Sequence, residues 1–224
     1  MHTNCRHIST VDAGCIPVTV LEMGIMQNNC LIVSDGREQG APAMVVDPAG
    51  DAEAIQKALG WFDLKYIVCT HNHCDHVMAL PQLAQATGAQ VVVGAQDAAL
   101  IESGQPGMFG DESVAPVKVG RKLSDGDVVE LGSLKFQVIH TPGHTKGGVC
   151  LYMPEQNGKP GLLFAGDTLF RSATGRVDFE GGSASDMRES LKKLAKLPDS
   201  TIVFPGHESL TTIGTERHRV IEAF

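Results

Sequence analysis

The chain has 224 residues, of which 42% are apolar and 20% charged, and its formal net charge is −8 with a sequence pI of about 5.5. This length and apolar content suffice for a globular chain with a hydrophobic core. The acidic balance lacks the basic face that holds nucleic-acid phosphates, so no nucleic-acid partner is predicted. The apolar runs are far shorter than the roughly 20 residues that a membrane helix needs, so no membrane partner is expected either.

The N-terminal residues are polar and lead into no apolar segment, so the sequence predicts no signal peptide and a cytoplasmic location. The six cysteines show no CxxC pair and no regular spacing. This indicates reduced thiols rather than a disulfide framework, which agrees with the predicted compartment.

Hydrophobic periodicity predicts strands interrupted by helices. In the first half, we predict strands at 17–23, 29–34, 43–47, 65–70 and 90–94, and helices at 51–60, 77–87 and 95–103. Residues 104–116 carry turn chemistry without periodicity, which predicts a long surface loop and a candidate lid. In the second half, we predict strands at 128–131, 135–140, 148–153, 162–165 and 201–204, and helices at 185–196 and 215–223. Two packed mixed sheets flanked by helices would bury these strands, although the pattern also allows a single doubly wound sheet.

Three histidines and an aspartate lie within six residues, in the motif HNHCDH at 71–76. Residues two apart in an extended segment point the same way, so His71 and His73 can converge on one ion, while Asp75 and His76 can face a second. Imidazole and carboxylate ligands suit zinc, iron or manganese. The alternative is a polar turn in which Asp75 caps the next helix, but capping explains one of the four residues.

Three further candidate ligands each follow a β-rich run and a turn residue. They are His144 in TPGHT, Asp167 in AGDT and His207 in FPGH. Sheets of the α/β type present catalytic groups at such strand ends, and the resulting seven ligands are enough for two metal sites. We interpret His140, just before TPGHT, as a hydrogen-bonded supporting histidine rather than a ligand.

On these motifs, together with GDTLF at 166–170 and GRVDF at 175–179, the sequence resembles the metallo-β-lactamase superfamily. Within it, the match is to the glyoxalase II type, the hydroxyacylglutathione hydrolases. The resemblance implies an α+β fold, a four-layer αβ/βα sandwich with two divalent metal ions in a groove at one edge. Zinc is the expected metal, with iron or manganese as alternatives. The implied ligands are His71, His73 and His144 on the first metal, Asp75, His76 and His207 on the second, and Asp167 as the bridge.

Two-domain glyoxalase II enzymes have a helical C-terminal domain that helps to hold glutathione, whereas only 17 residues (208–224) follow His207. We therefore predict a single domain over 1–224 that is similar to the shorter bacterial members. The zinc β-lactamases of the superfamily typically replace the bridging aspartate, so Asp167 argues against lactamase activity.

The resemblance implies a dinuclear metal-dependent hydrolase that cleaves S-acyl thioesters with a hydroxide held between the metals, which Asp75 orients. A thiolate leaves without strong acid assistance, so thioesters suit this chemistry better than amides. The expected partner is a small-molecule thioester, and an anionic one needs local cations. Arg171, Arg176 and Lys146 are the candidates, although Arg176 could instead form a structural turn pair with Asp178.

Two alternative functions stay open. Persulfide dioxygenases look similar across the same motifs but bind one Fe(II) through two histidines and one aspartate, here His71, His144 and Asp167. The run GDTLF followed by GRVDFEGG favours the hydrolase. A non-catalytic metal-binding scaffold is the third class, and the presence of all seven ligands disfavours it.

Overall fold

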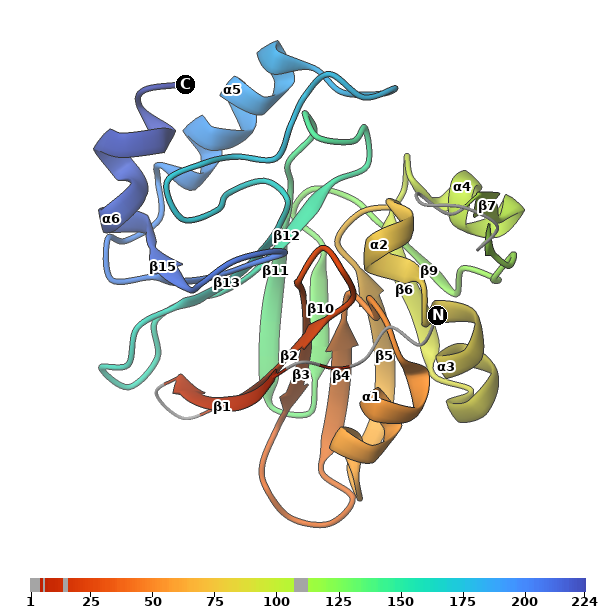
Figure 1. Ribbon diagram of the computed structural model, residues 1–224. Coiled ribbons are helices and arrows are strands. Elements are labelled where there is room, and N and C mark those ends of the chain that lie inside the picture. Colours follow the sequence, from red (N-terminus) through yellow and green to blue (C-terminus); the bar gives the residue numbers. More distant parts are fainter. Residues whose placement is uncertain (1–4, 6, 14–15, 107–112) are drawn as a thin grey trace.

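The computed structural model describes residue 5 and residues 7–13, 16–106 and 113–224 (Figure 1). Two mixed sheets pack face to face, and helices cover the outer face of each sheet. This is the predicted four-layer αβ/βα sandwich, and the alternative of a single doubly wound sheet is wrong. Among the described residues, no helix is long and apolar enough to cross a membrane.

The first sheet has seven strands and changes from antiparallel to parallel pairing at β4. Parallel neighbours need long crossovers, which here contain the helices α1 to α4. In spatial order the strands are β1 (His7–Ala13), β2 (Ile16–Met23), β3 (Asn28–Ser34), β4 (Pro42–Val46), β5 (Asp63–Cys69), β6 (Gln90–Gly94) and β9 (Arg121–Leu123).

The second sheet has six strands, of which only β13 and β14 pair in parallel. The crossover between those two contains α5. In spatial order the strands are β10 (Val128–Leu131), β11 (Leu134–His140), β12 (Val149–Met153), β13 (Leu162–Gly166), β14 (Ile202–Pro205) and β15 (Thr211–Thr212).

The helices form the two outer layers, and each layer has its own apolar contacts with a sheet. On the first sheet lie α1 (Ala52–Leu59), α2 (Cys74–Val77), α3 (Leu80–Thr87) and α4 (Ala98–Ser103). On the second sheet lie α5 (Ala184–Leu194), α6 (Ile213–Glu216) and a π-helical turn (Arg217–Ile221). Between the sheets, Phe136, Phe164 and Phe204 are almost fully buried, and their rings pack at centroid distances of 5.7 and 5.4 Å.

Local sequence signals locate most elements correctly. Asp51 caps α1 at the start of the predicted helix, because its Oδ1 accepts hydrogen bonds from the backbone of Glu53 and Ala54. The helix predicted over 77–87 is in fact two helices, and the second begins with Pro81 in its first turn, where proline is favoured. The closing helix begins earlier, at Ile213, and continues as the π-helical turn.

Three strands at the sheet margins carry little periodic signal. β1, β9 and β15 were not predicted, because the two large apolar residues of β1, Ile8 and Val11, are three positions apart and break the alternation, and the other two strands have only two or three residues. Inside the predicted loop at 104–116, β7 (Gln105–Pro106) pairs with β8 (Ser113–Val114). The middle of that loop, residues 107–112, lies outside the described residues.

Candidate metal centre

The seven predicted ligands come from four strand ends that meet at one edge of the sandwich. The segment after β5 runs directly into α2, and the other three positions follow β11, β13 and β14. In chain order the residues are His71, His73, Asp75, His76, His144, Asp167 and His207. The structure brings all seven into one cluster of mutual contacts.

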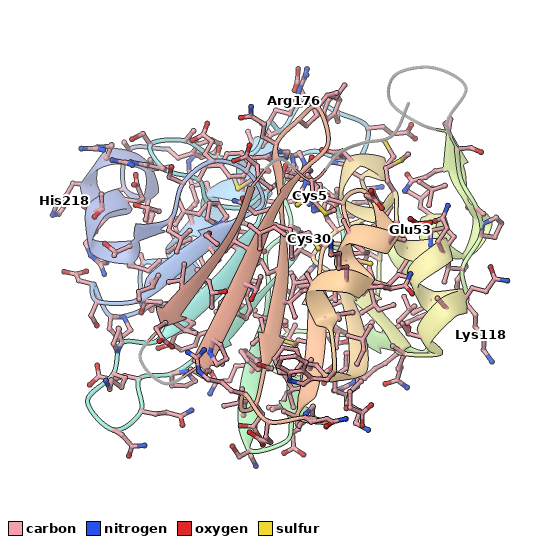
Figure 2. All side chains as sticks on the ribbon, turned by 60° about the horizontal axis from the view of Figure 1, so that its bottom comes forward. Cys5, Cys30, Glu53, Lys118, Arg176 and His218 are labelled. Carbon is pink, nitrogen blue, oxygen red and sulfur yellow. The ribbon has the colours of Figure 1, made fainter. Side chains whose placement is uncertain are left out.

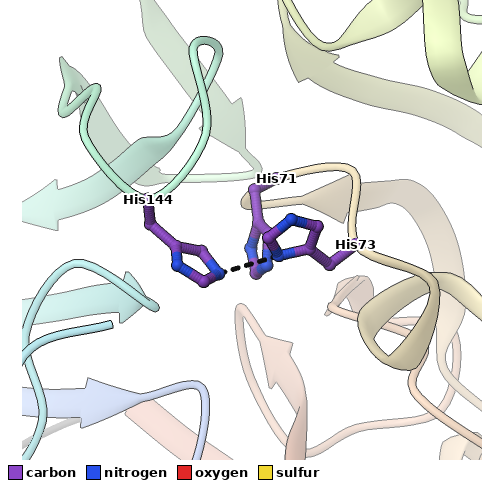
Figure 3. A group of neighbouring side chains, drawn as sticks. All are labelled: His71, His73 and His144. Carbon is purple, nitrogen blue, oxygen red and sulfur yellow. Dashed lines mark hydrogen bonds between the residues drawn. The ribbon is translucent and has the colours of Figure 1, made fainter. Parts of the chain in front are cut away.

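The first group consists of His71, His73 and His144, with one ring nitrogen of each within 4.8 Å of the others. Nδ1 of His73 lies 2.8 Å from Nε2 of His144 (Figure 3). Burial lowers the pKa of His71 well below its usual value. Burial and the neighbouring His144 lower the pKa of His73 to about 4. Both rings are therefore neutral at pH 7, which is the form that binds a metal ion.

The second group consists of Asp75, His76 and His207, again with ligand atoms within 4.8 Å. The Nε2 atoms of His76 and His207 are 3.2 Å apart, and Oδ2 of Asp75 lies 3.7 and 3.6 Å from them. Burial alone would lower the pKa of His76. The surrounding carboxylates, among which Asp167 has the largest effect, instead raise the pKa of His76 well above its usual value. This group therefore favours positive charge at its centre.

Asp167 lies between the two groups. Its Oδ2 is 3.3 Å from Nε2 of His144 in the first group and 3.6 Å from Nε2 of His207 in the second. Burial alone would raise the pKa of Asp167, but the nearby His76 and His207 hold it well below its usual range. A charged carboxylate is thus shared by both groups.

The donor set fits two divalent ions. Nε2 of His71 is buried without a hydrogen-bond partner among the described residues, and so is Oδ1 of Asp167, although His76 Nε2 lies 3.3 Å from it. Buried polar atoms are rarely left without a partner, and a bound metal ion would provide a partner for both of these atoms. Nitrogen and carboxylate donors are those that zinc, iron and manganese accept. The arrangement is therefore compatible with a dinuclear centre.

Four of the five histidines are held through Nδ1, so that Nε2 faces the centre. Such contacts fix the tautomer and the orientation of a ligand ring. Each ring donates from Nδ1–H to a fixed oxygen: His71 to Thr70 Oγ1 at 3.0 Å, His76 to Asp47 Oδ2 at 3.0 Å, His144 to the Arg176 carbonyl at 2.7 Å, and His207 to the Met26 carbonyl at 2.9 Å. His73 differs, because its Nδ1 is the atom that faces His144.

Asp75 lies inside α2, and Nδ2 of Asn28 donates a hydrogen bond of 3.0 Å to its Oδ2. The residue at the N-cap of α2 is His73, and no side chain caps this helix. The alternative role of Asp75 as a helix cap is therefore wrong.

Asp47 is a supporting residue that the sequence analysis missed. It follows β4 with a positive φ of 52° and is buried. Its Oδ1 accepts from the Thr70 backbone at 2.7 Å, and its Oδ2 accepts from the Thr70 hydroxyl at 2.7 Å as well as from His76. Its place at a strand end, like that of the ligands, is a signal that could have identified it.

Asp97 is a second missed residue, at the junction of β6 and α4. Its buried carboxylate accepts hydrogen bonds from the Asn72 backbone at 3.1 Å, the Thr145 hydroxyl at 2.7 Å and the Gly147 backbone at 2.7 Å. Burial raises its pKa, against the effect of these hydrogen bonds. The backbones here are so close that a Cβ at Gly94 would lie 1.8 Å from the Gly147 carbonyl oxygen.

Both metal groups open onto a hollow of about 690 Å³, which is also lined by Arg176, Phe170 and Phe179. Arg176 lies at the surface (Figure 2), where it forms two hydrogen bonds of 2.6 and 2.7 Å with Asp178 and stacks 3.9 Å from the centre of the Phe179 ring. Arg176 thus forms the predicted pair with Asp178, and it also lines the hollow, while its role in binding a substrate stays a prediction.

The other two predicted cations lie elsewhere. Lys146 lines a neighbouring hollow that shares a wall with the metal centre. Arg171 lines a separate hollow with Leu210 and Thr215, and none of the seven candidate ligands lines that hollow. His140 makes a hydrogen bond of 2.9 Å with the Lys146 carbonyl, in agreement with its predicted supporting role.

The chain matches the Metallo-beta-lactamase superfamily over residues 23–207 and belongs to that superfamily. Among curated relatives, an uncharacterized protein of Aquifex aeolicus is 36% identical, with 89% of this chain and 93% of that protein covered. The hydroxyacylglutathione hydrolase GloC of Haemophilus influenzae is 34% identical, with 90% and 93% covered.

Solved structures with the same fold include three at 26% identity or more. BLEG-1, a B3 metallo-β-lactamase, is 29% identical with a TM-score of 0.80, and 90% of this chain and 96% of that chain are covered. TTHA1623 in a di-iron-bound form is 32% identical with a TM-score of 0.77 and coverage of 89% and 97%. ETHE1 from Myxococcus xanthus is 26% identical with a TM-score of 0.68 and coverage of 96% and 83%.

Proposed function

We propose that this protein is a dinuclear metal hydrolase that cleaves S-acyl thioesters of the hydroxyacylglutathione type. The observation that carries the proposal is the position of Asp167 between two complete three-residue groups, with one oxygen within 3.6 Å of a histidine of each. The similarity to the hydroxyacylglutathione hydrolase of Haemophilus influenzae supports the thioester as substrate. The likeness to a di-iron-bound protein supports two ions.

In this proposal, His71, His73 and His144 would hold the first ion, Asp75, His76 and His207 would hold the second, and Asp167 would be shared by both. Bound there, divalent ions lower the pKa of a water ligand from about 15.7 towards about 7 and polarise a substrate carbonyl. Zinc is the expected occupant, and iron or manganese suits the same donors.

The residues of the chain position the reactants. Asp75 orients the attacking water, and the hydrogen bond from Asn28 fixes its carboxylate for that role. Phe170 and Phe179 provide apolar walls to the hollow, which limit the access of bulk water. Arg176 faces the same hollow and binds an anionic group of the thiol carrier. The leaving thiolate needs no strong acid, because a thiol with a pKa near about 8.5 is a good leaving group.

The experiment that tests this function combines two measurements on one sample. Metal content is determined by elemental analysis of protein expressed without added metal, and hydrolysis of S-lactoylglutathione is followed on the same protein. We expect about two ions per chain and thioester turnover that a chelator abolishes. Fewer than two ions together with no turnover, even after reloading with zinc, iron or manganese, would overturn the proposal. A chromogenic cephalosporin serves as a parallel substrate, because BLEG-1 is a lactamase of the same fold.

A second candidate function is persulfide oxidation by a single iron. The observation that favours it is that His71, His144 and Asp167 line one small hollow, and that Nε2 of His144 lies 3.3 Å from Asp167. The structural similarity to ETHE1 from Myxococcus xanthus supports this second function. In that reaction, glutathione persulfide, O₂ and water would give glutathione, sulfite and two protons. Oxygen uptake with the persulfide, one iron per chain and no thioester hydrolysis would favour this function.

A further inference from the structure

A second hollow, of about 430 Å³, lies beside the metal centre, and His73 and Phe179 line both this hollow and the larger one. We call it the side hollow, and its other walls include Leu100 on α4, Gln96, Gln105 and Lys146. None of the roles assigned to residues of the metal centre uses this space. A volume of this size is within the range of roughly 300–1,000 Å³ that holds drug-sized ligands.

The side hollow combines apolar and polar walls. Leu100 and Phe179 are large apolar side chains with 49% and 37% of their surfaces exposed, and both line this one hollow. The Phe179 ring is held in place, because it packs edge-on against His73 at a centroid distance of 5.5 Å and stacks beneath Arg176. Gln105 is also held in place, because its amide donates to the Asn72 carbonyl.

The side hollow also has polar walls. Lys146 lines it together with two carboxyl groups, those of Asp97 and Glu180, and with the carboxamide of Gln96, so its walls carry no excess of positive charge. The aliphatic stem of Lys146 passes Gly181, where a Cβ would lie 3.7 Å from its Cγ. A dianionic ligand finds no excess of positive charge here, whereas a mainly apolar chain without net negative charge meets matching walls.

The geometry of a thioester assigns its two halves to the two hollows. An acyl carbon is trigonal, so its carbon substituent and its sulfur substituent point apart. In the proposed function, the thiol carrier lies in the larger hollow beside Arg176, and its carbonyl lies at the metal groups. The acyl substituent then points past His73 and Phe179 into the side hollow.

We propose that the side hollow is the acyl-binding site, and that it selects acyl groups that are larger than lactoyl, mainly apolar and without net negative charge. This inference rests on the proposed thioesterase function and names its substrate class. A lactoyl group has only a few heavy atoms and would leave most of the side hollow unfilled. Each additional methylene that is buried in the side hollow stabilises the bound acyl group, which gives the larger acyl groups their advantage.

The test compares acyl groups on one constant thiol, glutathione, in the metal-loaded protein. Acetyl, lactoyl, hexanoyl and 6-hydroxyhexanoyl thioesters are hydrolysed by the wild type, by Leu100→Trp, which fills the side hollow, and by Leu100→Ala, which widens it. We expect the hexanoyl-to-acetyl ratio of kcat/KM to fall at least about tenfold in Leu100→Trp. The control is Ile8→Trp on β1, a residue 56% exposed that lines none of these hollows, and its ratio stays that of the wild type.

A binding measurement separates recognition from chemistry. Ketone analogues, in which a methylene replaces the sulfur, are titrated into the protein by calorimetry. The hexanoyl analogue is expected to bind at least about tenfold more tightly than the acetyl analogue, and Leu100→Trp removes the difference. If Leu100→Trp and Leu100→Ala both leave the hexanoyl-to-acetyl ratio of kcat/KM unchanged, the proposed acyl-binding site is wrong, whereas the proposed thioesterase function still stands. The absence of hydrolysis of every thioester would instead overturn the proposed function, and the acyl site with it.

Discussion

The buried carboxylate of Asp97 accepts a hydrogen bond of 2.7 Å from the hydroxyl of Thr145, and this contact joins loops from the two sheets. The same carboxylate accepts from the backbone of Asn72 in the segment after β5 and from Gly147 in the loop between β11 and β12. These loops contain all three histidines of the first metal group. The geometry of that group therefore depends on a residue that contacts none of its rings.

Replacement of Asp97 by alanine is expected to destabilise the protein. It leaves the buried backbone N–H groups of Asn72 and Gly147 without an acceptor, and each such loss costs about 1–3 kcal/mol. We expect the free energy of unfolding to fall by about 3 kcal/mol, measured by urea denaturation of the metal-free protein. Thr145→Val is the matched control, because it removes only one hydrogen bond. Equal stabilities for Asp97→Ala and this control would contradict the role of Asp97 as the link between the loops.

Asp167→Asn is expected to lower both metal content and activity. The amide keeps the shape of the side chain but loses the negative charge that lies between the two groups. Metal content should fall from about two ions to about one per chain, and kcat/KM for S-lactoylglutathione should fall by about 100-fold or more. Asp178→Asn, a nearby exposed carboxylate, is the control for metal content. Full metal content in Asp167→Asn would refute its bridging role.

Asp47→Asn is expected to weaken the second metal group more than the first. Asp47 holds Nδ1 of His76 directly at 3.0 Å, whereas it reaches His71 of the first group only through the Thr70 hydroxyl, and loss of a direct contact typically costs about 10- to 100-fold in metal affinity. Competition with a chromophoric chelator should show one ion weakened more strongly than the other. The exposed Asp12→Asn serves as the comparison, because Asp12 contacts Arg37 far from the centre. Two ions bound with wild-type affinity in Asp47→Asn would show that His76 needs no such support.

Arg176 and Asp178 give a pair of opposite predictions for an anionic thioester. Arg176→Ala removes a cation from the hollow and should raise KM by about three- to tenfold with little change in kcat. Asp178→Asn frees the same guanidinium from its two hydrogen bonds and should lower KM. Steady-state kinetics at low and high salt measure both effects. An uncharged thioester is the control, and a KM that neither variant changes would remove Arg176 from the binding site.

A pH effect on stability is expected at Asp125, remote from the metal centre. The Asp125 carboxylate accepts hydrogen bonds from the His140 backbone at 2.7 Å and from the Lys193 ammonium at 3.1 Å. Partial burial alone would raise the pKa of Asp125, but these two hydrogen bonds lower it below its usual value. A lowered folded-state pKa stabilises the protein above the unfolded-state pKa, and the stabilisation is lost as the pH falls through the folded-state value. Asp125→Asn should therefore lower Tm at pH 7 and leave it closer to the wild type in acid. A Tm difference that does not depend on pH would contradict this.

The fold was largely predictable because its signals are local. The cap at Asp51 and the apolar alternation of the strands each depend on a few neighbouring residues, and the structure confirms them. The pairing of β9 with β6 depends on a partner distant in sequence, so periodicity missed it.

The sequence by itself determined which side chains are candidate metal ligands. Histidines and aspartates at HNHCDH and at three strand ends are unusual enough in type and spacing to be identified without coordinates. Tertiary structure alone decided what holds and surrounds them. Asp97 reaches Gly147 across 50 positions, Asp47 reaches His76 across 29, and the side hollow forms between α4 and the segment around Phe179. The physical reason is that hydrogen bonds and cavities depend on distances in space, which only the packing of two sheets sets, whereas ligand chemistry belongs to each side chain.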